Sequence, residues 1–595
     1  MSDLLSSPSV RGRQWRLRAP DAASVDALAR DHALDPNTAR LLSGRGVGAA
    51  DIPAFLAPRL RDAMPDPSVL QDMDAAARAV LDAMEGGKRI TVFADYDVDG
   101  GTSAAQLLRW ARHWKQDWGL YVPDRVLEGY GPSREAFEKI KARGQDLVIT
   151  VDCGAAAKLA LEAAEGLGLE VVVIDHHLMD ANLPPARALV NPNRPDDESD
   201  LGYLAAAGVT FLLLVALNRE ARARGLGPGP KLLDFLGLAA LGTVCDVVPL
   251  VGLNRALVTQ GLKVLSQRRE PGVRALAEVA RAQKDLAVYD LGFLLGPRIN
   301  AGGRIGEADM GAKLLAYDEG GDAWRWAKEL DRVNTERRAL QDNIQREALA
   351  QAARLDHADL PVLVLASEDW HPGIIGIVAG RLKEKLGKPV ILVGGDRDGG
   401  GKGSGRSIKG VNLGGAIAGA KAAGLLKSGG GHAMAGGLSL EWSNLAPLRE
   451  HLADALSAEY AAAIADRATA IDLLLSPPAI DLALLDRFDR VGPFGSGNPK
   501  PSVVVPDVRV TYADRLKGGH IRCTFEDVHG HRIRGIAFRA HETGLEDALL
   551  SPGGFGAGGH VHVQGTLKRD RFRGEEKVDF HVSDIAPAEG PLSYT

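Results

Sequence analysis

The stretch VVVIDHHL, residues 171–178, runs from four apolar, β-branched positions straight into an aspartate and two adjacent histidines. A continuous apolar run of this kind is typical of a strand that is covered on both faces of a parallel sheet. Two comparable runs, RITVFA at 89–94 and DLVITV at 146–151, each follow a helical segment. Alternating helices and strands favour an α/β fold built on a parallel sheet.

The bulk properties of the chain are those of a large globular protein. A length of 595 residues predicts several domains, and 45% hydrophobic with 25% charged residues is ordinary composition. The sequence has no uninterrupted apolar run of 18 residues, no apolar signal core near its start, and three widely spaced cysteines. We therefore expect a cytoplasmic protein with no membrane partner. A net charge of -6 neither favours nor excludes nucleic acid.

Changes of pattern divide the chain into five predicted parts. The polar segment 322–355 lacks proline and glycine and predicts one long helix that bridges domains. After about residue 470, five short strands with period-2 alternation predict a barrel of OB type. The predicted parts are an N-terminal helical segment at 1–75, an α/β domain at 76–310, a connecting long helix at 311–357, a second α/β domain at 358–465, and an OB-fold domain at 466–595.

Acidic side chains follow three of the predicted strands. The strands are followed by Asp95, Asp97 and Asp99, by Asp152, and by Asp175, His176 and His177. Loops after parallel strands converge on one edge of a sheet, so we expect these groups to meet. Clustered carboxylates repel one another unless cations lie between them, and aspartate with imidazole suits Mn²⁺ or Mg²⁺. Two such ions would activate water and bind a phosphate.

Other interpretations of these acids stay open. A single aspartate after a strand is more often a helix cap or turn former than a ligand. The DxDxDG pattern also resembles the start of a calcium loop, which requires glutamate at its twelfth position. Counting from Asp95, that position is Gln106, so the calcium interpretation fails.

The ordered motifs identify a family. In sequence they are ADYDVDGGTS at 94–103, VDCG at 151–154, DHH at 175–177, TVCDVVPL at 243–250, GPRINAGGRIG at 296–306, HPGIIGIVAGRL at 371–382, SGRS at 404–407, GGGHAMAGG at 429–437 and FGSGNPKP at 494–501. This set resembles the DHH phosphoesterase superfamily, most closely its single-stranded-DNA-specific exonucleases, from about residue 20 to 588. The resemblance implies a DHH lobe and a DHH-associated lobe joined by a long helix, with an OB domain that helps to encircle the strand.

The resemblance also implies activity, partners and metal ligands. Single-stranded DNA with a 5′ end would be degraded from 5′ to 3′ into 5′-mononucleotides, in recombination and repair, with a single-strand-binding protein and a RecQ-type helicase as partners. Two Mn²⁺ or Mg²⁺ ions would be held by Asp97, Asp99, Asp152, His176 and Asp246, with Asp152 bridging and Asp95 as a supporting acid. His177 would contact the scissile phosphate or protonate the leaving oxygen. Phe93 departs from the pattern, because some members have a metal-binding histidine there.

Glycine-rich and basic segments supply the predicted substrate contacts. By resemblance, Arg304 would bind phosphate near the metals, and Arg125 with Ser404 and Arg406 would hold a 5′-terminal phosphate. His432 would contact the nucleotide beside the cut, and the remaining candidates are Asn300, Ser407 and His371. Taken alone, each arginine is more often an exposed surface charge than a ligand, and His371 equally fixes a helix start. Phe572, among basic residues in LKRDRFRGEEK, would stack on a base or simply lie at a hairpin tip.

Two alternative functions remain at this point. Manganese pyrophosphatases and phosphatases of short nucleotides share the DHH motifs but lack the C-terminal OB domain. A non-catalytic DNA-binding scaffold of the same superfamily would lose metal ligands, whereas this chain retains all five.

Overall fold

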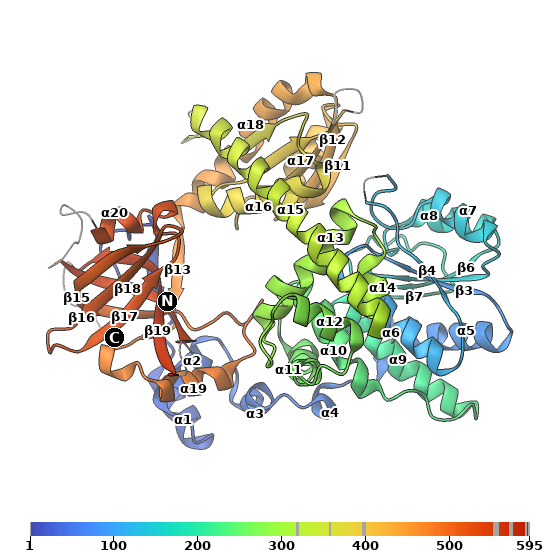
Figure 1. The fold of residues 1–595 in the computed structure, drawn as a ribbon, viewed down its shortest axis with the longest axis horizontal. Coiled ribbons are helices and arrows are strands. Elements are labelled where there is room, and N and C mark those ends of the chain that lie inside the picture. The colour runs from blue at the N-terminus through green and yellow to red at the C-terminus, as the bar shows by residue number, and fades with distance from the viewer. Residues whose placement is uncertain are drawn as a thin grey trace. The chain divides into compact units, whose positions relative to one another are not determined.

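The computed structural model describes residues 2–125, 127–316, 320–355, 359–395, 400–550, 559–570, 575–588 and residue 592. The chain divides into two compact units. Figure 1 labels their helices and strands. One unit comprises Pro58–Asn343 with Pro493–Asn498, and the other comprises Met1–Ala57, Ile344–Gly492 and Pro499–Thr595. Among the described residues, no helix combines the length and the apolar character needed to span a membrane.

The first unit is built on a five-stranded sheet in which every neighbouring pair is parallel. Its strand order is β4-β3-β5-β6-β7, with bounds β3 Ile90–Ala94, β4 Gly119–Tyr121, β5 Leu147–Val151, β6 Glu170–Ile174 and β7 Ala188–Val190. One face packs on α5 (Met73–Glu85), α6 (Val98–His113) and α9 (Ala206–Ala223). The other face packs on α7 (Arg134–Ala142) and α8 (Lys158–Gly166). The predicted doubly covered parallel sheet is confirmed.

Helices complete this unit after the sheet. They are α10 (Leu236–Cys245), α11 (Gly252–Ser266), α12 (Pro271–Val279), a π-helical turn η4 (Asp290–Leu295), α13 (Gly296–Ile305), α14 (Met310–Ala316) and the part of α15 (Gly320–Arg354) up to Asn343. The long helix was expected, but the predicted segment 311–357 also contains most of α14. The bridging interpretation is also incomplete, because Ala323, Ala327, Leu330 and Val333 of α15 are buried. One face of α15 is therefore a core face.

The second unit contains a mixed five-stranded sheet of order β11-β12-β10-β9-β8. Its elements are β8 Leu363–Ala366, β9 Val390–Gly394, β10 Gly401–Arg406, β11 Ser428–His432 and β12 Ala435–Leu440, with helices α16 Pro372–Leu386, α17 Leu413–Ala422 and α18 Leu445–Ala465. Only β8 and β9 pair in parallel. Two glycine-rich segments of the sequence thus form strands β10 and β11. In β10, buried glycines alternate with more exposed Lys402, Ser404 and Arg406, and a Cβ on Gly403 would lie 2.5 Å from Leu438 Cδ1.

A closed β-barrel follows in the same unit, as the period-2 pattern predicted. Its main strands are β15 Val503–Leu516, β16 His520–Glu526, β17 Arg532–Ala537, β18 His560–Asp570 and β19 Lys577–Pro587. They pair in the order β15-β16-β17-β19-β18, and β18 closes the barrel on β15.

The N-terminal segment differs from the expected run of short helices. Helices α1 Ala22–Asp31, α2 Pro36–Gly44, α3 Ile52–Leu56 and α4 Leu60–Ala63 are present. However, β1 (Ser2–Asp3) and β2 (Gln14–Leu17) form a three-stranded sheet with β13 (Ala468–Ile471). Trp15 of β2 is fully buried, and its Nε1 donates to Asp584 Oδ2 at 3.3 Å. A strand that pairs with residues some 450 positions away has no local signature in sequence.

Candidate metal centre and substrate-binding residues

The parallel sheet brings the predicted acids to one edge. Three strands end there, because β3 is followed by Asp95, Asp97 and Asp99, β5 by Asp152, and β6 by Asp175 and the two histidines. Asp246 arrives separately, at the C-terminal end of α10. Three groups have ligand atoms within 4.8 Å of one another, namely Asp95 with Asp97 and Asp152, Asp99 with His176 and Asp246, and Asp152 with His176 and His177.

His176 lies at the centre of this cluster. Its Nε2 atom is 3.3 Å from Asp152 Oδ1, 3.5 Å from Asp246 Oδ2 and 3.8 Å from Asp99 Oδ2. Burial lowers the pKa of His176 to about 4, so the imidazole is neutral near pH 7. These contacts are therefore not ion pairs. A neutral imidazole is the form of histidine that binds a metal ion.

The first acidic loop is held rigidly. Asp97 caps α6, its Oδ1 accepting from the backbone N–H of Asp99 at 2.8 Å and of Gly100 at 3.2 Å. Both oxygens of Asp99 accept from the start of α9, from the N–H groups of Ala206 at 2.7 Å and Ala207 at 2.9 Å. A Cβ on Gly100 would lie 2.4 Å from the Asp95 carbonyl oxygen, so only glycine fits there. The cap interpretation of Asp97 is thus confirmed alongside its place in the cluster.

Burial and mutual repulsion disfavour the charged form of the acids in the cluster. Burial, and to a smaller extent the charge of Asp97, raises the pKa of Asp99 to about 7. Burial, and to a smaller extent the charge of Asp99, raises the pKa of Asp246 to about 9. Burial and neighbouring acids also raise the pKa values of Asp95 and Asp152 well above the ordinary range. Cations between the carboxylates would remove this penalty.

Unsatisfied atoms provide the test of whether a metal fits. Asp95 Oδ1, Asp152 Oδ1 and His176 Nε2 are buried and make no hydrogen bond within the described part of the chain. Buried polar atoms are normally paired, so three such atoms facing one cluster need an explanation. A divalent ion coordinated by carboxylate oxygens and imidazole nitrogen supplies one. The residues present fit Mn²⁺ or Mg²⁺.

His177 has a different environment from His176. Asp175 Oδ1 lies 2.8 Å from His177 Nδ1 and also accepts from the backbone N–H groups of both histidines. Burial alone would lower the pKa of His177, but the hydrogen bond and charge of Asp175 raise it to about 9. Conversely, burial raises the pKa of Asp175, but the hydrogen bond and charge of His177 and the hydrogen bond from the Ala155 N–H together lower it to about 2. His177 is therefore a protonated imidazole beside the cluster.

Three residues around the histidines had no predicted role. The Tyr130 hydroxyl donates to the Asp152 carbonyl oxygen at 3.1 Å and lies 3.2 Å from His177 Nδ1. Asn191 Nδ2 donates to the His177 carbonyl at 2.8 Å, and Asn193 Nδ2 donates to the His176 carbonyl at 2.6 Å. The polar VNPN segment directly after β7 was the available signal for the two asparagines.

Phe93 lies outside the cluster. It is fully buried in the core on the α7–α8 side of the sheet and stacks on Tyr121 with ring centroids 5.3 Å apart. The acidic groups described above form without any contribution from this position.

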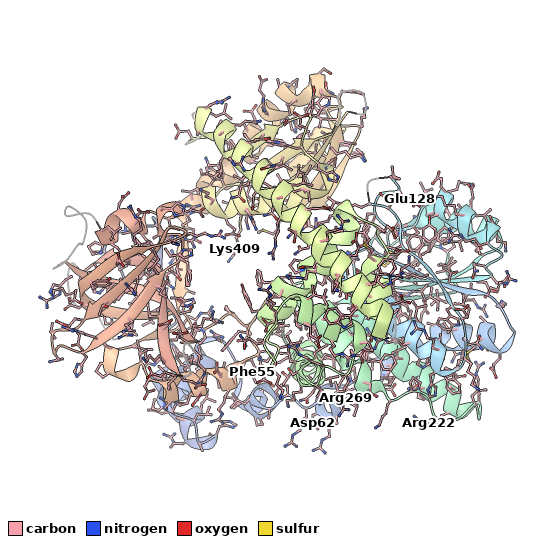
Figure 2. The ribbon with its side chains drawn as sticks, in the orientation of Figure 1. Phe55, Asp62, Glu128, Arg222, Arg269 and Lys409 are labelled. Carbon is pink, nitrogen blue, oxygen red and sulfur yellow. The ribbon has the colours of Figure 1, made fainter. Side chains whose placement is uncertain are left out.

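Two predicted arginines of the first unit lie near the acidic loop. Arg125 is 5.1 Å from the centre of the Tyr96 ring, and the charges of Arg125 and Arg304 act on the Tyr96 hydroxyl. Arg304 and Asn300 belong to α13, which comes so close to the loop that a Cβ on Gly303 would lie 2.7 Å from the Tyr96 carbonyl oxygen. Glu128, which is labelled in Figure 2, follows Arg125 closely in the sequence. Its carboxylate accepts from the Tyr121 hydroxyl at 2.6 Å.

Three predicted residues lie on or directly after β10. Arg406 Nη1 is 3.3 Å from Ser404 Oγ, and both side chains lie beside Gly376 of α16. Ser407, by contrast, is fully buried, and its hydroxyl donates to the Val411 carbonyl at 2.8 Å. The Ser407 side chain is thus held by its own loop, and its substrate-binding role stays a prediction.

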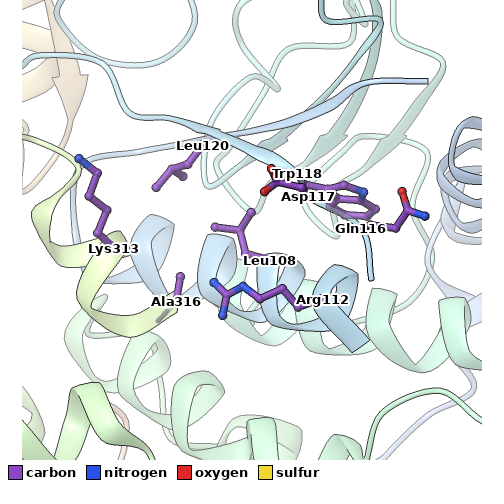
Figure 3. Close-up of a pocket in the computed structure, with 8 residues that line it drawn as sticks. All are labelled: Leu108, Arg112, Gln116, Asp117, Trp118, Leu120, Lys313 and Ala316. Carbon is purple, nitrogen blue, oxygen red and sulfur yellow. The ribbon is translucent and has the colours of Figure 1, made fainter. Parts of the chain in front are cut away.

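The predicted histidines of the second unit differ in exposure. His371 caps α16, its Nδ1 accepting from the Gly373 N–H at 3.0 Å, so it does fix a helix start. His432 is exposed at the end of β11. Phe572 lies outside the described residues. A cavity of about 240 Å³ between α6, β4 and α14, lined by residues such as Arg112, Trp118 and Lys313, contains none of the clustered acids (Figure 3).

Comparison with known proteins agrees with the motifs. The DHH family N-terminal domain matches residues 89–243, the DHHA1 domain 359–458 and the RecJ OB domain 471–584. The chain is 35% identical to the single-stranded-DNA-specific exonuclease RecJ of Salmonella typhimurium, over 97% of this chain and 100% of that protein. Crystal structures of RecJ from Thermus thermophilus in complex with Mn²⁺ and with Mg²⁺ each align with 97% of this chain. Their TM-scores are 0.80 and 0.74, at 30% and 28% identity, over 80% and 79% of those chains. The chain therefore belongs to the family of the single-stranded-DNA-specific exonuclease RecJ.

Proposed function

We propose that this chain is a divalent-metal-dependent exonuclease that hydrolyses single-stranded DNA from its 5′ end and releases 5′-mononucleotides. The observation that carries this proposal is the gathering of acids from separate strand ends around His176, with three buried atoms that lack hydrogen bonds. A non-catalytic scaffold would have no need of so costly an arrangement. Membership of the RecJ family supplies the substrate class.

Two ligand groups would hold the metal ions. Asp95, Asp97 and Asp152 would hold one ion, and Asp99, His176 and Asp246 the other, with Asp152 close enough to His176 to serve both. When bound, Mn²⁺ or Mg²⁺ supplies Lewis-acid stabilisation of phosphate oxygens and lowers the pKa of water. The chain itself contributes a rigid frame, because Asp97 and Asp99 are fixed by helix N-termini.

His177 would act on the phosphate directly. Asp175 orients the ring through Nδ1 and keeps it protonated, which leaves Nε2 as a donor toward a phosphate oxygen or the leaving oxygen. The Tyr130 hydroxyl lies 3.2 Å from Nδ1 and 3.3 Å from Nε2 of the same ring and would further restrict it. Asp175 and Tyr130 are thus proposed as positioning residues.

Cationic side chains would bind the DNA backbone. Arg304 is proposed to bind a phosphate next to the metals, with Asn300 on the same helix, and Arg125, which lies over the Tyr96 ring, stays proposed for the 5′-terminal phosphate. Ser404 and Arg406 lie beside Gly376 in the second turn of α16, where a hydroxyl and a guanidinium together would favour an anion such as a 5′-phosphate. Exposed His432 is proposed to contact the terminal nucleotide.

The barrel offers a surface for the rest of the strand. Phe538, directly after β17, has its ring between those of His520 (5.1 Å) and His581 (4.8 Å). Burial, with the charges of Lys568 and Lys500, lowers the pKa of His581 to about 4, so that ring is neutral and two lysines lie near it. Rings flanked by cations are the usual means of binding single strands without sequence preference. We propose that bases stack on Phe538.

A timed digest tests the function. An oligonucleotide labelled separately at each end would be incubated with the purified chain and Mn²⁺, Mg²⁺ or EDTA. Mononucleotides released first from the 5′ label, only with metal and only from single strands, are the expected result. Hydrolysis of pyrophosphate or dinucleotides without attack on long strands would contradict it. The single-strand-binding protein, the RecQ-type helicase and the role in recombination and repair stay predictions.

A further inference from the structure

An exposed aromatic pair lies on a helical turn that packs against Cys245, the residue before the proposed metal ligand Asp246. Tyr289 and Phe293 stack on each other with ring centroids 4.9 Å apart and planes 21° apart. They are 63% and 64% exposed. Single exposed apolar side chains are common and need no explanation. Two stacked rings with most of their surface in solvent form a continuous apolar face, which usually marks a binding surface.

The backbone under this pair is a π-helical turn. In η4 the N–H of Gly296 donates to the carbonyl of Leu291, five residues earlier in the chain. In an α-helix the acceptor would be the carbonyl four residues earlier. Leu291 and Leu295 point into the core and are fully buried. The buried leucines fix the turn, so the two aromatic side chains are held on its outer side. Such π-turns are frequent at functional sites.

The π-turn packs directly on the end of the helix that carries Asp246. Cys245 Sγ donates to the Leu291 carbonyl at 3.4 Å. A Cβ on Gly296 would lie 2.6 Å from the same sulfur atom, so the close approach requires glycine. Asp246 is the next residue after Cys245, and its Oδ2 is 3.5 Å from His176 Nε2. The aromatic pair therefore lies on the segment adjoining the metal cluster, in the same compact unit.

The same segment leads into the proposed phosphate-binding helix. Gly296 is the first residue of α13, which carries Asn300 and Arg304. Arg304, the proposed phosphate-binding cation, thus follows the two rings in the chain within one short helix. Single-stranded nucleic acid is bound by this combination, rings for bases and cations for the backbone.

We propose that Tyr289 and Phe293 form a stacking platform for bases of single-stranded DNA beside the metal centre. This inference rests on the proposed nuclease function and extends it to a specific binding residue pair. Every base has a π-face, so the platform holds DNA without reading its sequence. The same apolar face could instead bind a second copy of this chain, and the experiment below distinguishes that outcome from DNA binding. DNA is favoured over a second copy because the turn that carries the rings packs beside Asp246 and leads directly into α13.

Binding is measured in an Asp152→Asn background, so that hydrolysis does not consume the DNA. A series of 5′-phosphorylated oligonucleotides would carry one 2-aminopurine each, moved one position at a time. We expect Tyr289→Ala with Phe293→Ala to weaken binding roughly tenfold. The change of 2-aminopurine fluorescence on binding should be lost at one or two adjacent positions only. Phe293→Trp should preserve both signals, whereas Phe293→Leu should not, because leucine has no π-face.

A matched control is Trp324→Ala, which removes another partly exposed ring of the same unit, one packed on Lys328. It should leave affinity and the fluorescence pattern unchanged. In the catalytically intact protein, the double variant should raise KM far more than it lowers kcat. Thermal unfolding of each variant checks that the fold is retained, and Phe293→Leu covers the case in which the double variant unfolds.

Unchanged affinity and an unchanged fluorescence pattern in a folded double variant would overturn the platform. Sedimentation that shows a dimer dissociated by the double substitution, with DNA binding intact, would assign the rings to a second copy and overturn it too. If the wild-type chain neither binds nor cleaves single strands, the proposed function itself fails. Normal 5′ digestion with KM insensitive to the rings would refute the platform alone.

Discussion

Oδ1 of Asp152 lies 3.3 Å from Nε2 of His176, and neither buried atom makes a hydrogen bond within the described residues. The two residues follow neighbouring parallel strands, β5 and β6. Asp152 also has a backbone φ of 61°, in the left-handed region. Asparagine tolerates this region far better than alanine, so Asp152→Asn removes charge with little backbone strain.

We expect Asp152→Asn to reduce hydrolysis of a 5′-labelled oligonucleotide by roughly 100-fold or more, because a carboxylate near both ligand groups is lost. Single-strand affinity, measured by fluorescence anisotropy, should change less than about twofold. In EDTA the variant should melt roughly 2 °C above wild type, since one buried acid no longer repels its neighbours. Glu162→Gln, an exposed acid on α8, is the control. Turnover above half of the wild-type value would contradict the assignment.

The raised pKa values predict an opposite pH dependence with and without metal. Asp99 and Asp246 have folded pKa values of about 7 and about 9, above those of unfolded aspartate. In EDTA their contribution to stability is present at low pH and is lost as pH rises through 7 to 9. Metal binding needs the deprotonated acids, so the Mn²⁺-induced rise in Tm should grow over the same range. Calorimetry between pH 6 and 9 measures both effects. A Mn²⁺ effect that shrinks with pH, or an EDTA slope unaltered in Asp246→Asn, would be inconsistent with this cluster.

Arg406→Ala should weaken the preference for a phosphorylated 5′ end by roughly tenfold, because a charge-assisted contact to phosphate is removed. Degradation of a strand with a 5′-hydroxyl should change little. Competing digests of the two substrates in one tube measure the ratio. Lys421→Ala removes an exposed cation of α17 in the same unit and serves as the control. Equal losses on both substrates would mean that Arg406 has only a general electrostatic role.

Phe538→Ala on the barrel should weaken single-strand binding by about fivefold to tenfold, since a stacking ring is lost. Long oligonucleotides should be affected more than short ones if the barrel binds DNA away from the cut. Phe538→Trp should retain affinity. Val528→Ala, which truncates another exposed apolar side chain of the barrel, is the matched control. A loss that is the same for both lengths would argue against this role.

Trp15→Ala should lower the free energy of unfolding of the barrel-containing unit by about 3–5 kcal/mol, the usual cost of removing a fully buried aromatic side chain. Trp15→Phe should cost less, because it retains ring packing and loses the hydrogen bond to Asp584. Urea unfolding followed by circular dichroism measures both. Arg16→Ala, on the next residue, loses only exposed ion pairs and should cost less than about 1 kcal/mol. A Trp15→Ala cost as small as that control would show that the N-terminal strand is dispensable.

Local patterns were sufficient for much of this architecture. Apolar runs such as residues 171–174 predicted the parallel strands, and period-2 alternation predicted the barrel, because strand burial leaves a direct trace in neighbouring residues. The acids at the strand ends could be grouped before any coordinates, since parallel strands end at one edge. Strand β10 could not be predicted in this way, because its buried positions are glycines and not apolar side chains. An added Cβ at these positions would have no room beside Leu438 and Leu413.

By itself, the sequence determined the family, the parallel sheet, the barrel and the acids gathered at one sheet edge. Tertiary structure alone decided that residues 14–17 pair with 468–471, that Ser407 is buried, that Tyr130 reaches His177, and that the turn carrying the stacked rings packs on Cys245. The physical reason is the range of the interactions. Periodicity records how a residue meets its own strand or helix, whereas these contacts depend on which distant surfaces pack together, and no spacing within a segment encodes that choice.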